Sequence, residues 1–148
     1  MHNNKDDSFQ GFRALCGEHG LRATPQRMAV YRELMTARDH PSAETIYRRV
    51  KEGFPSISFD TVNRTLLTFA SLGVADVVEG FGDARRFDPE IRSHHHLLCV
   101  RCRRIVDIHH EAYDALPIPP KAAHGFKILS KRVVLRGICS RCQNGGAG

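Results

Sequence analysis

Two Cys-x-x-Cys pairs in the last third of the chain constrain its fold more than any other feature. The first pair consists of Cys99 and Cys102, and the second consists of Cys139 and Cys142. Each pair is typical of a knuckle that directs two sulfurs toward one ion, and two knuckles supply the four thiolates of a tetrahedral structural zinc site. Thiol redox chemistry and an iron–sulfur cluster are the alternatives. The spacing favours zinc, which would join the two ends of a small C-terminal domain.

Length and charge limit the class of protein. A chain of 148 residues forms one large domain or two small ones. No apolar run is long enough to span a membrane, and residues 1–10 lack a secretory signal. We therefore expect a cytoplasmic protein with reduced thiols. A net charge of +6 and a pI near 9.4 favour a nucleic-acid partner, although charge alone also fits a merely basic protein.

Helix start and stop signals predict four helices in the first half of the chain. Thr24, Ser42 and Ser58 are candidate N-caps, and Gly20 and Gly73 are candidate stops. The predicted helices cover residues 9–20, 25–37, 43–51 and 59–72. A β-hairpin follows, with its turn at 79–83. This order is typical of an extended winged helix-turn-helix, and the alternative is a small helical domain without a DNA partner.

The second half of the chain has a different pattern. Strands are predicted around residues 97–98, 104–108 and 126–138, with a short helix at 111–116. The fold class is therefore α+β. We expect a winged-helix DNA-binding domain at 1–87 and a metal-binding domain at 88–148, with a hinge near 85–90.

Histidines beside the first cysteine pair suggest a second metal site. In a strand, His94 and His96 share one face and His95 lies on the other. Convergence of three imidazoles and two carboxylates would suit Fe(II), Mn(II) or Zn(II), and ligands from both domains would let metal favour one domain arrangement. The candidate ligands are His40, Asp88, His94, His96 and Asp107. The alternative is that each is an ordinary core or surface residue. We expect His109 and His110 to be solvated, with a further metal role as the alternative.

Several motifs together resemble the ferric uptake regulator family. They are Thr24-Pro25-Gln26-Arg27, His40-Pro41-Ser42-Ala43 with Ile46-Tyr47, Arg86-Phe87-Asp88, His94-His95-His96 before Cys99, and Ile105-Val106-Asp107. The resemblance covers roughly residues 9–142. It implies a homodimeric, metal-dependent transcription regulator with an N-terminal winged helix and a C-terminal α/β dimerisation domain.

Within that family, the chain resembles the peroxide-sensing repressors, which carry Asp at the positions of Asp88 and Asp107. The resemblance implies that the five candidate ligands bind the regulatory metal and that the four cysteines hold structural zinc. Ser93 and Lys131 stand where iron-responsive members usually have histidines, which implies one regulatory site per subunit.

The same resemblance implies a sensing mechanism. Fe(II) at the regulatory site would react with hydrogen peroxide and oxidise His40 or His94, after which metal and DNA would be released. Mn(II), which does not react in this way, would hold the repressor on DNA. An iron- or zinc-responsive metal-uptake repressor of the same family is the alternative.

The predicted recognition helix departs from the family in one position. Relatives usually read Thr-Val-Tyr where this chain reads Thr61-Val62-Asn63, and Asn63 could pair with adenine. We therefore expect a shifted operator preference on double-stranded DNA. The candidate DNA contacts are Arg22, Ser58, Thr61, Asn63 and Arg64. Arg85 and Arg86 on the wing are phosphate contacts or solvated charges.

Two other classes of protein fit the sequence less well. An enzyme would combine an open metal site with a nucleophile motif, a Gly-rich phosphate loop or an HExxH helix, and we find none of these motifs. We therefore expect a regulator and not an enzyme. A zinc module that binds only protein would show no metal-dependent affinity for DNA.

Overall fold

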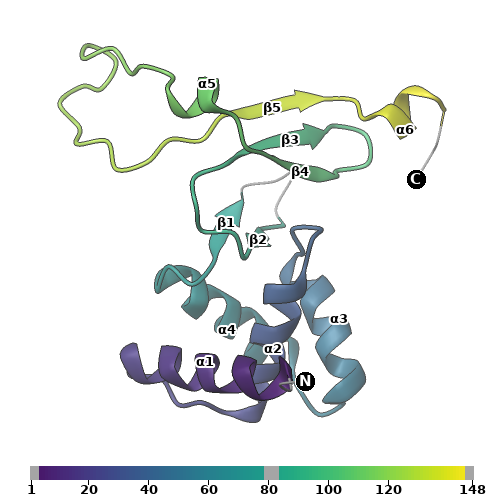
Figure 1. Ribbon diagram of the computed structural model, residues 1–148. Helices are drawn as coiled ribbons and strands as arrows, with labels where there is room; N and C mark the ends of the chain where they lie inside the picture. Colours follow the sequence, from purple (N-terminus) through teal and green to yellow (C-terminus); the bar gives the residue numbers. More distant parts are fainter. Residues whose placement is uncertain (1–3, 79–83, 146–148) are drawn as a thin grey trace. The chain divides into compact units, whose positions relative to one another are not determined.

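The computed structural model describes residues 4–78 and 84–145 (Figure 1). It divides into two compact units, Met1–Ile91 and Arg92–Gly148. Helices and strands occur in both units, which confirms the α+β class. The hairpin turn expected at 79–83 lies outside the described residues, and the domain boundary expected after residue 87 stays a prediction.

Four helices form most of the first unit, and local capping fixes where three of them begin. They are α1 (Asn4–Glu18), α2 (Pro25–Thr36), α3 (Ala43–Gly53) and α4 (Phe59–Ser71). The side chains of Thr24, Ser42 and Ser58 each accept a hydrogen bond from the backbone N–H three residues later, at 3.1–3.3 Å. These are the N-caps that the sequence predicts. Only α1 begins earlier than expected, in a polar stretch without apolar periodicity.

The helices of the first unit bury one shared apolar core. Phe12 and Cys16 of α1 pack with residues of the other three helices. Strands β1 (Asp76–Val78) and β2 (Arg86–Asp88) pair antiparallel, and Phe87 points from β2 into the same core. Three helices beside a two-stranded hairpin form the winged-helix arrangement. Burial of Phe87 fixes the face of β2, so the residues on either side of it face away from the core.

A three-stranded sheet organises the second unit. Its strands are β3 (His95–Cys99), β4 (Ile105–Ile108) and β5 (Val134–Gly137), in the order β4-β3-β5. The central strand β3 runs antiparallel to β4 and parallel to β5. Short helices α5 (Glu111–Asp114) and α6 (Ser140–Gln143) complete the unit. The central position of β3 places its side chains beside residues of both neighbouring strands.

The prediction of a long strand at 126–138 was wrong for residues 126–133. Only Val134–Gly137 pair with β3, in the register His96 to Val134 through Cys99 to Gly137. Because β3 begins at His95, residues before Val133 have no strand beside them in the described sheet. The β-branched residues of this segment predicted a strand, but β3 is too short to pair with all of it.

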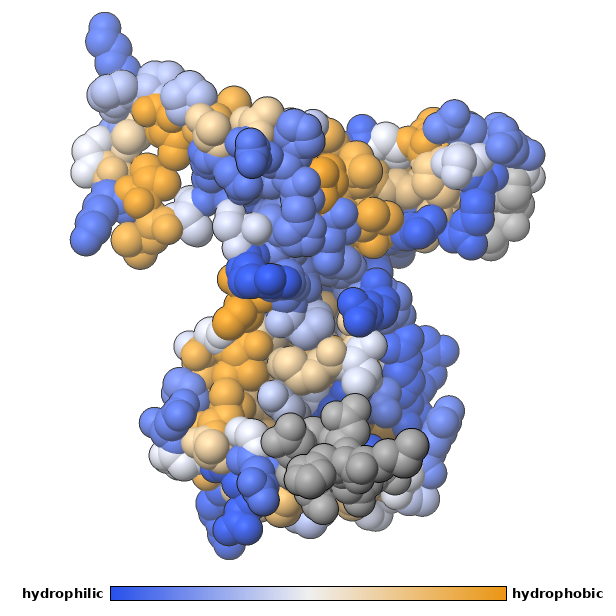
Figure 2. All heavy atoms as spheres, in the orientation of Figure 1, coloured by the Kyte–Doolittle hydropathy of each residue, from blue (hydrophilic) through white to orange (hydrophobic). Residues whose placement is uncertain are grey.

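The second unit exposes much of its apolar surface. Leu98 and Ile105 are buried, whereas large apolar side chains along the sheet are 37–45% exposed. These exposed residues are Leu97, Val100, Val106, Val134, Leu135 and Ile138. Figure 2 shows hydrophobic residues on the visible face of this unit. A unit with so small a core needs further stabilisation from a bound metal, a protein partner or both.

Candidate metal centres and nucleic-acid surface

The four cysteines expected to bind zinc lie together in the second unit. Their sulfur atoms all lie within 4.8 Å of one another, and each cysteine is a free thiol. Cys99 ends β3, and Cys139 immediately precedes α6. Because β3 and β5 are parallel, the two pairs meet at the same end of the sheet. Their convergence, predicted from the spacing, is confirmed.

Backbone amides make this cluster suited to thiolates. The amides of Cys102 and Cys139 lower the pKa of the Cys99 thiol to about 6; the Cys139 N–H lies 3.3 Å from the Cys99 sulfur. Burial raises the pKa of Cys142 to about 12. One thiol therefore favours ionisation, because amide donors stabilise its negative charge, while another resists it, because burial disfavours the charged form. A divalent cation removes that conflict, and four clustered sulfurs fit tetrahedral zinc.

A second group of side chains that could hold a metal ion lies at the start of the same sheet. His94 and His96 point to one face of β3, and their Nε2 atoms lie 3.0 Å apart. Asp107 is paired with His96 across β3 and β4, and its Oδ1 lies 3.6 Å from the Nε2 of His94 and 3.4 Å from that of His96. Nitrogen ligands about 2.1 Å from one ion lie about 3.0–3.4 Å apart at octahedral or tetrahedral angles. The spacing therefore fits two nitrogens and one carboxylate on one metal.

The tautomer of His94 is set by its neighbour Arg92. The Nδ1 atom of His94 lies 2.6 Å from the Arg92 carbonyl oxygen, which can only accept a hydrogen bond. Nδ1 is therefore the donor, and Nε2 keeps the lone pair that a metal requires. Both His94 and His96 are buried, so bulk water has little access to these two rings. The ring of the exposed His109 stacks on His94, with centroids 5.7 Å apart.

The first unit holds another histidine–carboxylate pair. The Nε2 atom of His40 lies 3.3 Å from Oδ2 of Asp88. Both side chains are buried, with relative exposures of 4% and 2%. His40 comes from the loop between α2 and α3, and Asp88 ends β2. All five predicted regulatory ligands therefore belong to two groups, one pair in this unit and one trio in the other.

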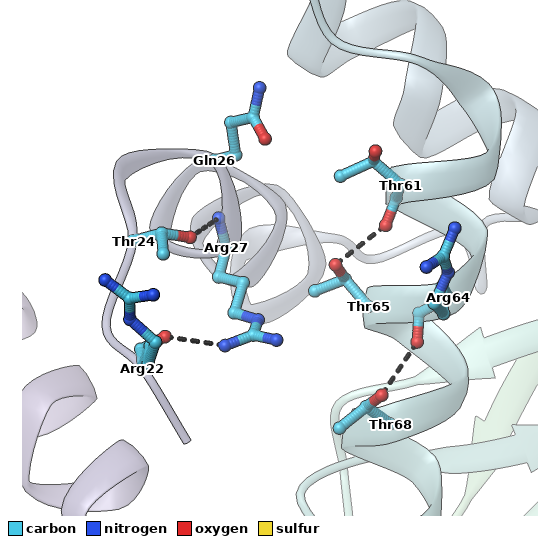
Figure 3. A pocket seen from close by; sticks show the side chains of 8 residues that line it. All are labelled: Arg22, Thr24, Gln26, Arg27, Thr61, Arg64, Thr65 and Thr68. Carbon is cyan, nitrogen blue, oxygen red and sulfur yellow. Dashed lines mark hydrogen bonds between the residues drawn. The ribbon is translucent and has the colours of Figure 1, made fainter.

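A basic cavity lies between α2 and α4 in the first unit. It measures about 330 Å³ and is lined by Arg22, Thr24, Gln26, Arg27, Thr61, Arg64, Thr65 and Thr68. Figure 3 shows these residues around the cavity, on the segment that leads into α2, at the start of α2 and along one face of α4. The Arg27 guanidinium donates a 2.8 Å hydrogen bond to the Arg22 carbonyl, which fixes the side chain within the cavity. Three guanidinium groups beside hydroxyl and amide groups are suited to a phosphate.

The other predicted DNA contacts have different surroundings. Asn63 is half-buried and lines a separate cavity of about 330 Å³ together with Arg85. The Ser58 hydroxyl accepts the Thr61 N–H at 3.1 Å and so caps α4. Arg64 forms an ion pair with Asp60 one turn earlier. Asn63 and the pair of Thr61 and Arg64 therefore lie on different sides of α4.

Sequence reasoning missed two contacts near the metal groups. Arg86, expected to be a phosphate contact or a solvated charge, donates hydrogen bonds to the backbone carbonyls of Asp39 and His40. His95, which alternation placed on the opposite face from His94, hydrogen-bonds Asp114. The alternation of β3 was a signal for His95, whereas no local signal in the sequence pointed to Arg86.

The first unit is a winged helix, and the second is a sheet that carries a thiol cluster and histidine–carboxylate side chains. This combination is typical of metal-dependent DNA-binding regulators. Residues 18–136 match the ferric uptake regulator family. The chain is 32% identical over 127 residues to the peroxide-responsive repressor PerR of Staphylococcus epidermidis, an alignment covering 86% of this chain and 85% of that relative. The chain belongs to the ferric uptake regulator family, as its motifs predicted.

Solved structures agree with this assignment. The Helicobacter pylori ferric uptake regulator Fur shares the fold with a TM-score of 0.77 at 20% identity, covering 95% of each chain. A zinc-bound manganese uptake regulator has a TM-score of 0.67 at 29% identity and covers 86% of this chain and 98% of that one. The chain is accordingly a metal-responsive transcriptional repressor of a family of dimeric DNA-binding regulators. None of the helices in the described ranges has the length and apolar character to cross a membrane.

Proposed function

We propose that this repressor senses hydrogen peroxide through a regulatory metal held by the histidine–carboxylate groups of both units. The proposed ligands are His40, Asp88, His94, His96 and Asp107, with Cys99, Cys102, Cys139 and Cys142 as ligands of structural zinc. The observation that carries the proposal is the trio in the second unit. There, His94 and His96 direct Nε2 atoms 3.0 Å apart beside the Asp107 carboxylate.

Donor chemistry supports Fe(II) or Mn(II) as the regulatory metal. Three imidazoles and two carboxylates form a mixed nitrogen and oxygen ligand set, which suits these ions and also zinc. Bound Fe(II) would supply electrons to hydrogen peroxide and so generate an oxidant beside its own ligands. His94 is one expected target, because its ring is fixed by Arg92 and is covered on one side by the exposed His109. His40 is the other expected target.

Loss of a ligand would lower metal affinity and then DNA affinity. An imidazole that gains an oxygen atom is a poorer nitrogen donor. If ligands from both units share one metal, occupancy favours the arrangement of the units that binds DNA. Oxidation of His40 or His94 would remove that preference, and the repressor would leave its operator.

Charge and apolar surface support the partners in this proposal. The arginine-lined cavity between α2 and α4 would bind backbone phosphates of double-stranded DNA. The exposed apolar side chains along β3–β5 would be covered by a second copy of the chain. A DNA-binding protein with five free cysteines is expected to act in the reducing cytoplasm.

Peptide mass spectrometry tests the sensing mechanism directly. Zinc-replete protein would be loaded with Fe(II) or with Mn(II), exposed briefly to peroxide and assayed in parallel for binding to an operator duplex. We expect one added oxygen on the peptide carrying His40 or His94, only with Fe(II), together with release of DNA. Release of DNA without histidine oxidation would contradict the proposal.

A metal-uptake repressor is the second candidate function. The ligand set is also suited to zinc, and the chain is 29% identical to a zinc-bound manganese uptake regulator. This candidate predicts DNA binding that follows metal occupancy alone and no oxygen gain at any histidine. The same experiment therefore separates the two functions.

A further inference from the structure

The loop that carries His40 has an unfavourable backbone conformation. This His40 loop comprises residues 37–42, between α2 and α3. His40 has a φ of +47°, in the left-handed region that residues with a Cβ rarely occupy. Its side chain is 4% exposed, so the ring is fixed in the interior of the unit. Surrounding contacts must hold such a conformation in place.

Arg86 binds two backbone carbonyls of this loop, and Arg49 pairs with the side chain of Asp39. Its Nε donates to the carbonyl oxygen of His40, and its Nη2 donates to the carbonyl oxygen of Asp39 at 2.8 Å. The next residue, Phe87, donates its backbone N–H to the carbonyl of Pro41 at 2.9 Å. Two successive residues of β2 therefore bind three successive carbonyls of the His40 loop.

The same strand supplies the carboxylate that faces the His40 ring. Asp88 lies two residues after Arg86 on β2, and its Oδ2 lies 3.3 Å from His40 Nε2. Arg86 and Asp88 thus contact the backbone and the imidazole of one residue. If the His40 loop moved along β2, these contacts would break, and the His40 imidazole would separate from the Asp88 carboxylate.

Only arginine has the donor geometry for this contact. A guanidinium is planar and presents parallel N–H groups to two acceptors, whereas the ammonium of lysine is a single centre on a flexible chain. Arg86 is also half-buried, so its donors face the carbonyls and not bulk water. A shorter or single-centre side chain at this position would leave at least one carbonyl without its donor.

We infer that Arg86 is a positioning residue for the regulatory metal, because it holds His40 in the conformation that aligns the imidazole with Asp88. This inference rests on the proposed function, in which His40 and Asp88 are ligands. Residues that orient metal ligands typically change metal affinity by about 10–100-fold when replaced. The guanidinium of Arg86 binds backbone carbonyls of the His40 loop, so its effect acts through the His40 backbone.

Co(II) absorption and Mn(II) affinity test the inference on full-length, zinc-replete protein. The variants are Arg86→Gln, Arg86→Lys and His40→Ala, with Arg38→Gln as the control. Arg38 is an exposed arginine of the same loop. Co(II) would be used as an optical probe of ligand number, and Mn(II) binding would be measured by electron paramagnetic resonance.

We expect Arg86→Gln to weaken Mn(II) binding by about 10–100-fold and to shift the Co(II) spectrum toward that of His40→Ala. Arg86→Lys should show a smaller change in the same direction, and Arg38→Gln should match the unmodified protein. Thermal unfolding of each variant, followed by circular dichroism, would confirm that the helical unit remains folded.

Three results have distinct meanings. A Co(II) spectrum that changes in His40→Ala but not in folded Arg86→Gln or Arg86→Lys would overturn the role of Arg86 and leave the proposed ligands intact. A spectrum that does not change in His40→Ala would instead overturn the proposed ligand set. An equal loss of affinity in Arg38→Gln would also overturn the inference, because it would show a general effect of charge.

Discussion

The imidazole of His95 binds the carboxylate of Asp114, with Nε2 3.0 Å from Oδ1. The backbone N–H of Val133 donates to the other ring nitrogen, Nδ1, also at 3.0 Å. Nδ1 is therefore the acceptor, and Nε2 carries the proton that Asp114 accepts. This single buried ring connects β3, α5 and the segment before β5, on the face of the strand opposite to His94.

Replacement of His95 should destabilise the second unit without removing the regulatory metal. We expect His95→Ala to lower the free energy of unfolding by about 2–4 kcal/mol, because it leaves a cavity and removes two hydrogen bonds. Asp114→Asn keeps an oxygen acceptor and should cost about 1 kcal/mol or less. Urea denaturation of the metal-loaded protein would measure both changes.

Metal content provides the control for this first prediction. We expect one structural zinc and one regulatory metal per subunit in both variants, as in the unmodified protein. Loss of a metal equivalent in Asp114→Asn would contradict the structural role of the pair and would indicate a further metal site around His95.

The structural zinc should determine whether the second unit folds. Cys102→Ser removes one of four sulfurs and should abolish zinc retention, because a closed tetrahedral site needs all four ligands. Structural zinc typically contributes about 10–16 kcal/mol of apparent binding free energy, far more than a core this small can replace. Colorimetric zinc assay and limited proteolysis would check the result.

The buried Cys16 offers a matched control. Its thiol packs in the apolar core of the first unit, and Cys16→Ser should leave the zinc content unchanged. Proteolysis of Cys102→Ser should begin within Arg92–Gly148 and spare the helices of the first unit. An intact second unit that lacks zinc would contradict the prediction.

Thiol reactivity should differ within the cysteine cluster when alkylation follows zinc chelation at once, before the second unit unfolds. The pKa of Cys99 is lowered to about 6 by backbone amides, so this group is a thiolate at pH 7. The pKa of Cys142 is raised to about 12 by burial, so it remains a protonated thiol. Because the thiolate is the nucleophile, we expect iodoacetamide to modify Cys99 before Cys142 at pH 7, and to lose this selectivity only well above pH 9.

Differential alkylation and peptide mass spectrometry would measure this order. In urea, both thiols should return to the ordinary cysteine pKa and react at similar rates. Equal rates without urea, while circular dichroism still shows a folded second unit, would contradict the predicted environments of the two sulfurs.

The parts of the fold that depend on local chemistry were predictable from the sequence. Thr24, Ser42 and Ser58 cap helices because their hydroxyls accept N–H groups three residues away. The alternation of side chains along a strand was enough to separate His95 from His94 and His96. Convergence of the cysteines followed from the limited ways in which two knuckles can complete one tetrahedral site.

Features that depend on distant partners were not predictable. Arg86 binds the carbonyl of a residue 46 positions earlier, and its local sequence gives no sign of that partner. The segment 126–133 has the composition of a strand but lies beyond the length of β3. In both cases the tertiary partner, and not the intrinsic preference, determines the outcome.

Asn63 should alter which operator bases the repressor prefers. The amide of Asn63 can make a bidentate pair with adenine, which a tyrosine ring cannot make. We expect Asn63→Tyr to shift relative affinities among operator variants by about 1–3 kcal/mol at one base pair. Binding to a panel of duplexes would measure the shift, and identical preferences in both proteins would contradict base recognition by Asn63.

Arg27 should bind phosphate and contribute equally to all DNA sequences. Its guanidinium lines the cavity between α2 and α4 and is held by the carbonyl of Arg22. We expect Arg27→Gln to weaken binding to operator and unrelated duplexes by a similar factor. The slope of log affinity against log salt should fall by about 1 for each phosphate that the variant no longer binds. Arg32→Gln removes the same charge from an exposed position on α2 that does not line the cavity, so a smaller change in slope is expected. Fluorescence anisotropy at several salt concentrations would compare them, and equal slopes for the two variants would show that Arg27 acts only through net charge.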